Sequence, residues 1–237
     1  MSNTFLLVLS PHLDDAIFSV CGYLLETKHR TKIVTVCAGI PDNNDLSSWD
    51  KRCGFTSGQL AAISRREEDF LACSKVGADY EHLNFTDFPY SNIKNNSSIS
   101  NEITKRLPNI QEIWIPLGIG MHPDHITVRD SALEILNTKK INIVFYADVP
   151  YSNAYKWSTP DSERKENFKW KPVIEEIKKK GFILDKPEIK ILKKREIETK
   201  LAIASLYKSQ IKQLKNHYPN LMEFGGELAT EVIWRLR

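Results

Sequence analysis

Apolar runs alternate with segments of helical spacing along the first 150 residues of the chain. Each run is continuous and bounded by polar or turn-forming residues, as is typical of strands buried on both faces of a parallel sheet. The runs expected to form strands are Phe5–Leu9, Lys32–Ala38, Tyr80–Phe85, Glu112–Pro116 and Ile141–Ala147. Because helical segments separate them, the sequence predicts an α/β fold. We expect it to be Rossmann-like, with a mostly parallel sheet and helices on both faces.

The helices expected between these strands have recognisable starts and ends. The first begins at Asp14 or Asp15, either of which suits a helix cap, and its apolar residues follow helical spacing. Gly77 is expected to end the second helix in a left-handed conformation. The later helices are expected over Ser57–Val76, from near Ser98, and over Asp124–Leu136.

The pattern weakens beyond Tyr151. Residues 152–181 are polar and rich in lysine, and we expect them to form a lid or a subunit contact. The remaining pattern predicts a long helix over Lys194–Leu214 and a short helix over Leu228–Trp234. We therefore expect a single domain, residues 1–237, made of an α/β core (1–150) and a C-terminal lid or helical extension (151–237). The long polar loop 39–56 is expected to be functional or mobile.

The charge balance and the cysteines limit the classes of function. Lys and Arg number 33 and Asp and Glu number 30, and the resulting charge of +3 is too mild to argue for a nucleic-acid partner. The cysteines Cys21, Cys37, Cys53 and Cys73 form no C-x-x-C pair and are expected to be reduced thiols. The first residues lack a basic region, and their apolar run is too short for a signal or a membrane span. We expect a cytoplasmic protein with no membrane partner.

Two short segments carry candidate chemistry, and each follows a predicted strand. The first is Pro11-His12-Leu13-Asp14-Asp15, and the second is His122-Pro123-Asp124-His125. The carboxyl ends of parallel strands lie along one edge of a sheet, where α/β proteins bind ligands. We therefore expect both segments to reach the same cleft, although more than a hundred residues separate them.

Three of these side chains are candidate metal ligands. A catalytic zinc ion takes about three ligands from histidine nitrogens and carboxylate oxygens and keeps one position open. His12 and Asp15 are three residues apart across a helix start, and His125 can supply the third ligand from the other segment. Zn²⁺ is the expected metal, although two histidines and a carboxylate also suit Fe²⁺. Taken singly, an Asp-Asp pair is more often a helix cap and a His-x-x-His more often plain surface or core.

The neighbouring side chains suit the remaining steps of a hydrolysis. Zinc lowers the pKa of water and polarises an amide carbonyl, but a base must still accept a proton from the water. Asp14 is placed for that role. His122 is expected to stabilise the charged intermediate or to protonate the leaving amine, and Asp124 to hold the ring of His122 in one tautomer. A metal phosphoesterase would want a second metal and more converging carboxylates than the sequence offers.

Together, the two segments resemble the signature of the LmbE-like, or PIG-L, family of N-acetylglucosaminyl deacetylases. Their order, separation and placement after strands agree with that family, in which Leu13 is usually a proline. The resemblance extends over most of the chain, to Ser64–Asp69, Tyr146–Tyr151, Lys200 with Tyr207, Ser209 and Gln210, and Glu231 with Trp234. It implies that His12, Asp15 and His125 bind zinc, that Asp14 is the general base, and that His122 and Asp124 act as described above.

The resemblance also implies a substrate class, namely an N-acetylated amino sugar or a glycoside of one. Arg66, on family grounds, and Asp148, just after the fifth strand, are expected to contact it. The alternatives for these two are a solvated or ion-paired arginine and a turn residue before Pro150. Other functions remain open: an amidase acting on a different acyl conjugate, or a binding protein without turnover. A homo-oligomer is also an open option.

Overall fold

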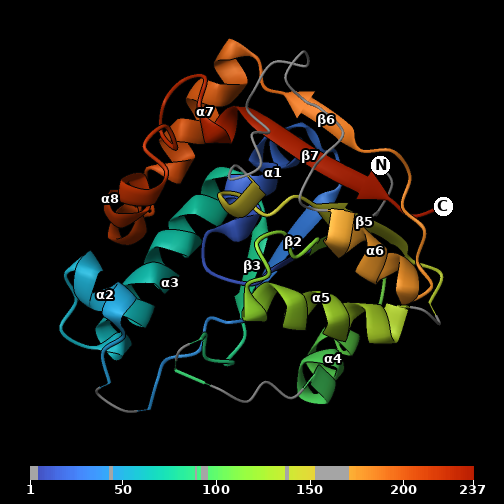
Figure 1. The fold of residues 1–237 in the computed structure, drawn as a ribbon, viewed down its shortest axis with the longest axis horizontal. Coiled ribbons are helices and arrows are strands. Elements are labelled where there is room, and N and C mark those ends of the chain that lie inside the picture. Colours follow the sequence, from blue (N-terminus) through green and yellow to red (C-terminus); the bar gives the residue numbers. More distant parts are fainter. Residues whose placement is uncertain (1–4, 43–44, 89, 92–95, 137–138, 153–170) are drawn as a thin grey trace.

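The computed structural model describes residues 5–42, 45–88, 90–91, 96–136, 139–152 and 171–237. They build one mixed sheet of seven strands in the order β3-β2-β1-β4-β5-β7-β6 (Figure 1). Strands β1 to β5 are parallel, whereas β7 runs antiparallel to both β5 and β6. The strands are β1 (Phe5–Ser10), β2 (Arg30–Thr35), β3 (Asp79–His82), β4 (Ile110–Pro116), β5 (Asn142–Tyr146), β6 (Glu188–Ile191) and β7 (Thr230–Arg235).

Helices cover both faces of the sheet because successive strand residues point to opposite faces. In β1, Leu7 and Leu9 pack with residues of α4, α5 and α6, whereas Leu6 and Val8 pack with residues of α1, α3 and α7. The α/β fold class expected from the sequence is therefore confirmed. The helices are α1 (Asp15–Glu26), α2 (Ser48–Cys53), α3 (Gly58–Lys75), α4 (Asn96–Thr104), α5 (Pro123–Leu136), α6 (Lys171–Lys179), α7 (Lys194–Ala204) and α8 (Lys208–His217).

Gly77 has a φ of 73°, so α3 ends with a left-handed residue next to its last turn, as expected. Within the long loop 39–56, the structure forms the short helix α2. The long helix expected over Lys194–Leu214 is divided into α7 and α8 by Ser205–Tyr207. Most of the segment expected to be a lid lies outside the described residues, since 153–170 are not described.

The helix expected over Leu228–Trp234 is wrong. Only a single 3-10 turn, Glu227–Ala229, precedes strand β7, which pairs with both β5 and β6. Val232 and Trp234 face one core cluster and Ile233 faces the other, so the strand is buried on both faces. A strand of that kind has no alternation of polar and apolar residues, and a short apolar run cannot then be distinguished from a helix. The C-terminal part of the chain thus contributes two strands to the central sheet.

The strand order reverses between β1 and β4, which lie side by side in the middle of the sheet. The connection after β1 leads to α1 on one face, and the connection after β4 leads to α5 on the other. A crevice opens where two such connections diverge, and this is where open α/β sheets bind ligands. Among the described residues, no helix is both long and apolar enough to cross a membrane.

Candidate active site

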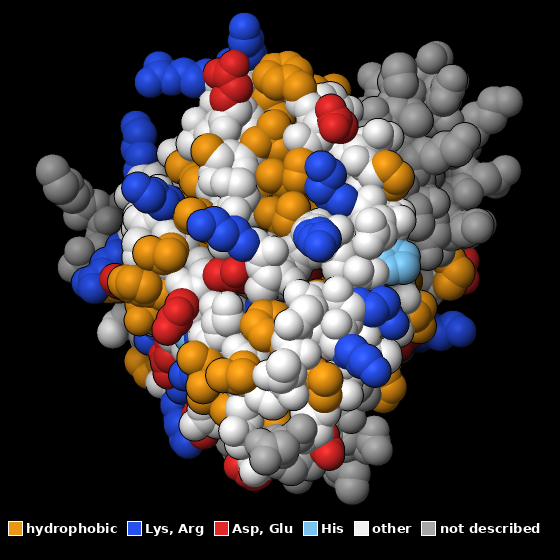
Figure 2. Space-filling model, turned by 90° about the vertical axis from the view of Figure 1, so that its left-hand side faces the viewer, with side chains coloured by type: hydrophobic (Ala, Val, Ile, Leu, Met, Phe, Trp, Pro, Cys, Tyr) orange, Lys and Arg blue, Asp and Glu red, His pale blue; other side chains and the backbone are white. Residues whose placement is uncertain are grey.

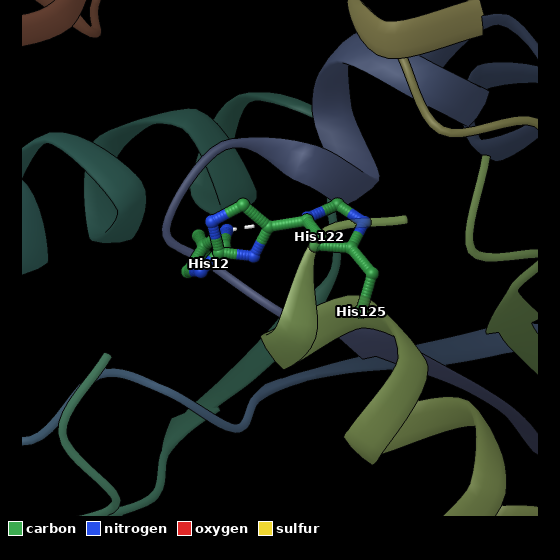
Figure 3. Close-up of side chains that lie close together, drawn as sticks. All are labelled: His12, His122 and His125. Carbon is green, nitrogen blue, oxygen red and sulfur yellow. Dashed lines mark hydrogen bonds between the residues drawn. The ribbon is translucent and has the colours of Figure 1, made fainter. Parts of the chain in front are cut away.

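Three imidazoles converge at the crevice between β1 and β4. His12 comes from the loop after β1, His122 directly precedes α5, and His125 lies in its first turn (Figure 3). One nitrogen of each ring lies within 4.8 Å of the others. The His12 ring centroid lies 4.9 Å from that of His122 and 5.1 Å from that of His125. The two sequence segments therefore meet, as their position after neighbouring strands predicted.

Asp15 joins two of these rings in a tighter arrangement. Its Oδ2 atom lies 3.1 Å from Nδ1 of His12 and 3.2 Å from Nε2 of His125. The same two nitrogens are 3.3 Å apart. Ligands about 2.0–2.2 Å from a tetrahedral metal lie roughly 3.3–3.5 Å from one another. These three atoms therefore have the spacing needed to hold one divalent cation, and their donor types suit zinc or iron.

The ring nitrogens that face away from Asp15 each contact a carboxylate. Nε2 of His12 lies 2.8 Å from Oδ2 of Asp124, and Nδ1 of His125 lies 2.6 Å from Oδ1 of Asp148. When the rings are neutral and those nitrogens donate, the nitrogens that face Asp15 carry the lone pairs that a metal ion needs. Carboxylates behind metal-binding histidines fix the tautomer in this way. Two ring nitrogens supported in this way indicate a metal site more specifically than the donor types alone do.

The contacts of Asp124 differ from the sequence expectation. Its carboxylate was expected to hold the ring of His122, but Oδ2 contacts His12 and also accepts from the backbone N–H of Phe88 at 3.0 Å. The backbone N–H of Asp124 donates to Nδ1 of His122, at 3.3 Å. Because the first turn of α5 directs this side chain across to the β1 loop, the ring that it contacts comes from a segment 112 residues away.

Asp148 also has different contacts from those expected of a substrate-binding residue. Its side chain is fully buried. Besides the bond to His125, its Oδ2 atom accepts from the backbone N–H groups of Gly118 and Ile119, both at 2.8 Å. Both carboxylate oxygens are therefore engaged within the protein. The residue ties the β4 loop and the His125 ring together rather than facing the crevice.

Burial and charge shift the titration of the three clustered groups. Burial alone would lower the pKa of His12 and of His125. The hydrogen bond and negative charge of Asp15 act in the opposite direction on both rings, and Asp148 adds to this effect on His125. The pKa of each ring is therefore raised to about 9. Burial opposes ionisation of Asp15, yet the charge of His125 and hydrogen bonds from both rings hold its pKa well below the usual range. Together these groups form a strongly polarised cluster in which a cation can replace protons.

Asp14 lies at the cap position of α1 but makes no side-chain capping bond. Its carboxyl lines a cavity of about 520 Å³, and burial together with the charge of Asp15 raises its pKa. The capping role that an Asp-Asp pair usually has is therefore not the one seen for Asp14. His122 lines the same cavity, and its ring centroid lies 5.9 Å from that of Tyr151.

The two neighbouring arginines of α3 differ in position. Arg65 is buried, lines the cavity and forms an ion pair with Asp50 of α2. Arg66, the expected substrate contact, donates to the carbonyl oxygen of Ala38 at 3.0 Å and is not among the residues that line the cavity. Helical spacing could have identified Arg65, because it shares the buried face of α3 with Ala61 and Asp69. The sequence analysis missed this signal.

Residues far from the two motifs form the other walls of the cavity. They come from loop 39–56, from the segment after β3, from the end of β5 and from α8. The sequence indicated loop 39–56 as functional or mobile, and Tyr151 and Gln210 as part of the family resemblance, but it placed none of them at the site. Nothing local indicates that α8 lies over the carboxyl ends of the strands. The principal ones are Trp49, Asp50, Tyr90, Tyr151, Gln210, Leu214, His217 and Tyr218.

Comparisons with known proteins point in one direction. The model of the PIG-L family, described as GlcNAc-PI de-N-acetylase, matches residues 7–136. The search of curated proteins found no match. A triple mutant of Orf2, a deacetylase of the teicoplanin biosynthetic pathway, has a similar structure, with 24% identity, coverage of 99% of this chain and 98% of that one, and a TM-score of 0.80.

Two further solved structures are similar. The zinc-inhibited form of teicoplanin deacetylase Orf2 is 20% identical to this chain, and the alignment covers 99% of this chain and 98% of the Orf2 chain, with a TM-score of 0.73. The N,N'-diacetylchitobiose deacetylase of Pyrococcus horikoshii is 18% identical to this chain, and the alignment covers 99% of this chain and 84% of the deacetylase chain, with a TM-score of 0.57. At these identities the likeness shows a common fold.

Proposed function

Because the chain belongs to the PIG-L family of de-N-acetylases, we propose that it is a metal-dependent hydrolase that removes the N-acetyl group from an amino sugar. In this reaction water adds to the amide carbonyl, the C–N bond breaks, and acetate and a free amine are released. The observation that carries the proposal is the triangle of His12 Nδ1, Asp15 Oδ2 and His125 Nε2, with sides of 3.1, 3.2 and 3.3 Å.

His12, Asp15 and His125 would hold a divalent metal through these three atoms, and the metal would supply a lowered pKa of water and polarisation of the amide carbonyl. Asp14, with its raised pKa and its place in the cavity wall, accepts the proton of the attacking water. His122 hydrogen-bonds to the carbonyl oxygen as it gains charge, or delivers a proton to the leaving amine. Asp124 and Asp148 hold the rings of His12 and His125 in the tautomers that expose their ligand nitrogens.

The proposed substrate is a small N-acetylated amino sugar or a glycoside of one. The similar structures include deacetylases of the teicoplanin pathway and of N,N'-diacetylchitobiose, which supports this class. A different acyl group or a larger amide conjugate is the nearest alternative. We further propose that the whole chain acts as one domain, since β6 and β7 complete the central sheet. The cytoplasmic location stays a prediction from the sequence, as does the absence of a nucleic-acid partner.

The native metal needs its own test. Zn²⁺ suits the ligand set, and one similar deacetylase has been crystallised in a zinc-inhibited form. Two histidines and one carboxylate suit Fe²⁺ as well. Activity should therefore be measured after the chelated protein is reloaded separately with zinc, iron(II) or another divalent ion.

The decisive experiment is a hydrolysis screen of N-acetylated amino sugars with the metal-loaded protein, read by the appearance of acetate and primary amine. We expect release from N-acetylglucosamine-type compounds and a loss of about 10²–10⁴ in kcat for Asp14→Asn, with bound metal retained. Asp79→Asn, an exposed change on β3, is the matched control and should keep full activity. Wild-type activity in the Asp14 variant would exclude it as the base, and no release with any metal would exclude the function.

A further inference from the structure

One wall of the cavity is built by two elements that the proposed chemistry does not use. Trp49 comes from α2, Leu214 and His217 come from α8, and Tyr218 follows α8 directly. In Figure 1 these helices lie on the left, apart from α5 with the histidine cluster. Figure 2 views the molecule from that side and shows hydrophobic side chains among lysines and arginines. The cavity thus runs from the histidines to a second, aromatic end.

Helix α2 is held firmly against the body of the protein. Asp50, which is 1% exposed, accepts hydrogen bonds from Arg65 of α3 and from the hydroxyl of Tyr90. Ser47 caps the helix by accepting from the N–H of Asp50 at 3.0 Å, and its own N–H donates to Tyr90 at 2.9 Å. A carboxylate buried with two partners fixes the position of the helix that carries it. The adjacent Trp49 is therefore presented by a pre-organised wall.

The aromatic side chains of this wall are arranged as a platform. The rings of Trp49 and His217 are stacked, with centroids 6.2 Å apart and planes inclined by 27°. The guanidinium of Arg52 lies 5.7 Å from the centroid of Trp49. Trp49 is only half-buried although it lines the cavity. A large aromatic surface left open inside a cavity is a favourable contact for a flat apolar group.

A buried donor lies in the same cavity. Gln210 of α8 is 9% exposed, and its Nε2 group has no hydrogen-bond partner among the described residues. The Nε atom of Arg65 is also buried and has no hydrogen-bond partner among the described residues. A buried donor without an acceptor destabilises the folded protein, so such groups usually meet water or a ligand. Both residues line the cavity, so a bound molecule with acceptor oxygens can satisfy them.

We propose that the α2–α8 wall is a binding site for an aromatic aglycone, so that the preferred substrate is an aryl glycoside of the N-acetylated sugar. The inference rests on the function proposed above. The sugar lies at the histidine cluster, Gln210 donates to one of its oxygens, and the aryl group packs on Trp49 and His217. Pro41, Trp49 and Leu214 present mainly apolar surface at this end of the cavity. An aryl group covers such a surface at less cost than a second sugar, whose hydroxyls need polar partners.

The test measures binding of three probes by titration calorimetry: the methyl and phenyl glycosides of N-acetylglucosamine, and N,N'-diacetylchitobiose. The protein is the full metal-loaded chain carrying Asp14→Asn, so that the probes are not consumed. We expect the phenyl glycoside to bind about five- to tenfold more tightly than the methyl glycoside. Trp49→Ala should bring this ratio close to one, and Trp49→Phe should retain most of it.

Phe70→Ala is the matched control, since Phe70 is an exposed aromatic residue of α3 outside the cavity lining. It should leave the ratio at the wild-type value. The inference is overturned by equal affinities for the methyl and phenyl glycosides, by a ratio that Trp49→Ala does not change, or by tighter binding of the disaccharide than of the phenyl glycoside.

The outcome is separable from that of the proposed function. If the wild-type protein releases acetate from all three probes and the affinities are equal, the hydrolase stands and the aryl site falls. If it releases acetate from none of them and the phenyl preference depends on Trp49, the aryl site stands and the proposed function falls.

Discussion

The carboxylate of Asp124 lies 2.8 Å from Nε2 of His12, and the two residues are 112 positions apart in the chain. One belongs to the first turn of α5 and the other to the loop after β1. The contact connects the two motifs through a pair of side chains, and it leaves Nδ1 of His12 to face Asp15.

Asp124→Asn should weaken metal binding. An amide is a poorer acceptor than a carboxylate and cannot hold the His12 ring in its ligand tautomer as firmly, so we expect the metal dissociation constant to rise about 10- to 100-fold. Competition with a chromogenic chelator measures the constant. Asp130→Asn, on the same helix and paired with Arg129 and Lys180, should leave it unchanged. An unaltered metal affinity in the Asp124 variant, with a changed pH profile, would instead favour the role at His122 that the sequence suggested.

Metal binding should release protons. In the metal-free protein the pKa values of His12 and His125 are raised to about 9, so both rings are largely protonated at neutral pH. Ligation needs the neutral rings, so binding near pH 7.5 should release about one to two protons per ion. Affinity should accordingly rise with pH and level off above about pH 9. Titration calorimetry in buffers of different ionisation enthalpy counts the protons, and binding without release would contradict the protonated state.

Gly118→Ala should disturb the loop that holds Asp148. Gly118 has a φ of 87°, and a Cβ there would lie 2.7 Å from Cδ1 of Ile126 and 3.0 Å from a guanidinium nitrogen of Arg129. We expect a loss of about 1–2 kcal/mol in the free energy of unfolding from the backbone alone, together with weaker metal binding. Gly225→Ala is the control, because no atom lies within 4 Å of its added Cβ and its φ is not positive. Equal stability of the two variants in urea denaturation would refute the expectation.

Lys200→Met should destabilise the fold without touching the cavity. Lys200 and Glu231 are both fully buried, with Nζ and Oε1 2.7 Å apart, and Glu231 also accepts from the N–H groups of Gly22 and Tyr23. Removing the lysine leaves a buried charge without its counter-ion, which costs about 3–5 kcal/mol. Lys212→Met, at an exposed position of α8, should change stability little. Denaturant unfolding measures the stability of both variants. Similar unfolding midpoints for the two variants would show that the buried ion pair contributes nothing to the free energy of unfolding.

The sequence predicted the parallel part of the sheet because strands buried on both faces consist of continuous apolar runs, and each of the five expected runs overlaps a strand. It missed β7 because that strand is buried on both faces and its apolar run Val232–Trp234 has no alternation to distinguish it from a helix. It placed the substrate contact at Arg66 on family grounds, whereas the structure brings Arg65 to the cavity. Two adjacent helical residues point about 100° apart, and Arg65 is the one that shares the buried face of α3 with Ala61 and Asp69.

From the sequence alone, His12, Asp15 and His125 are expected to come together, because both motifs follow strands whose carboxyl ends share one edge of a parallel sheet, and the structure brings them together. Which carboxylate supports which ring was decided only by the tertiary structure: Asp124 contacts His12, and Asp148 contacts His125. The same is true of the wall formed by α2 and α8. These contacts depend on strand register and on the direction of single side chains across more than twenty residues of sequence, and no local pattern of polar and apolar residues records either one.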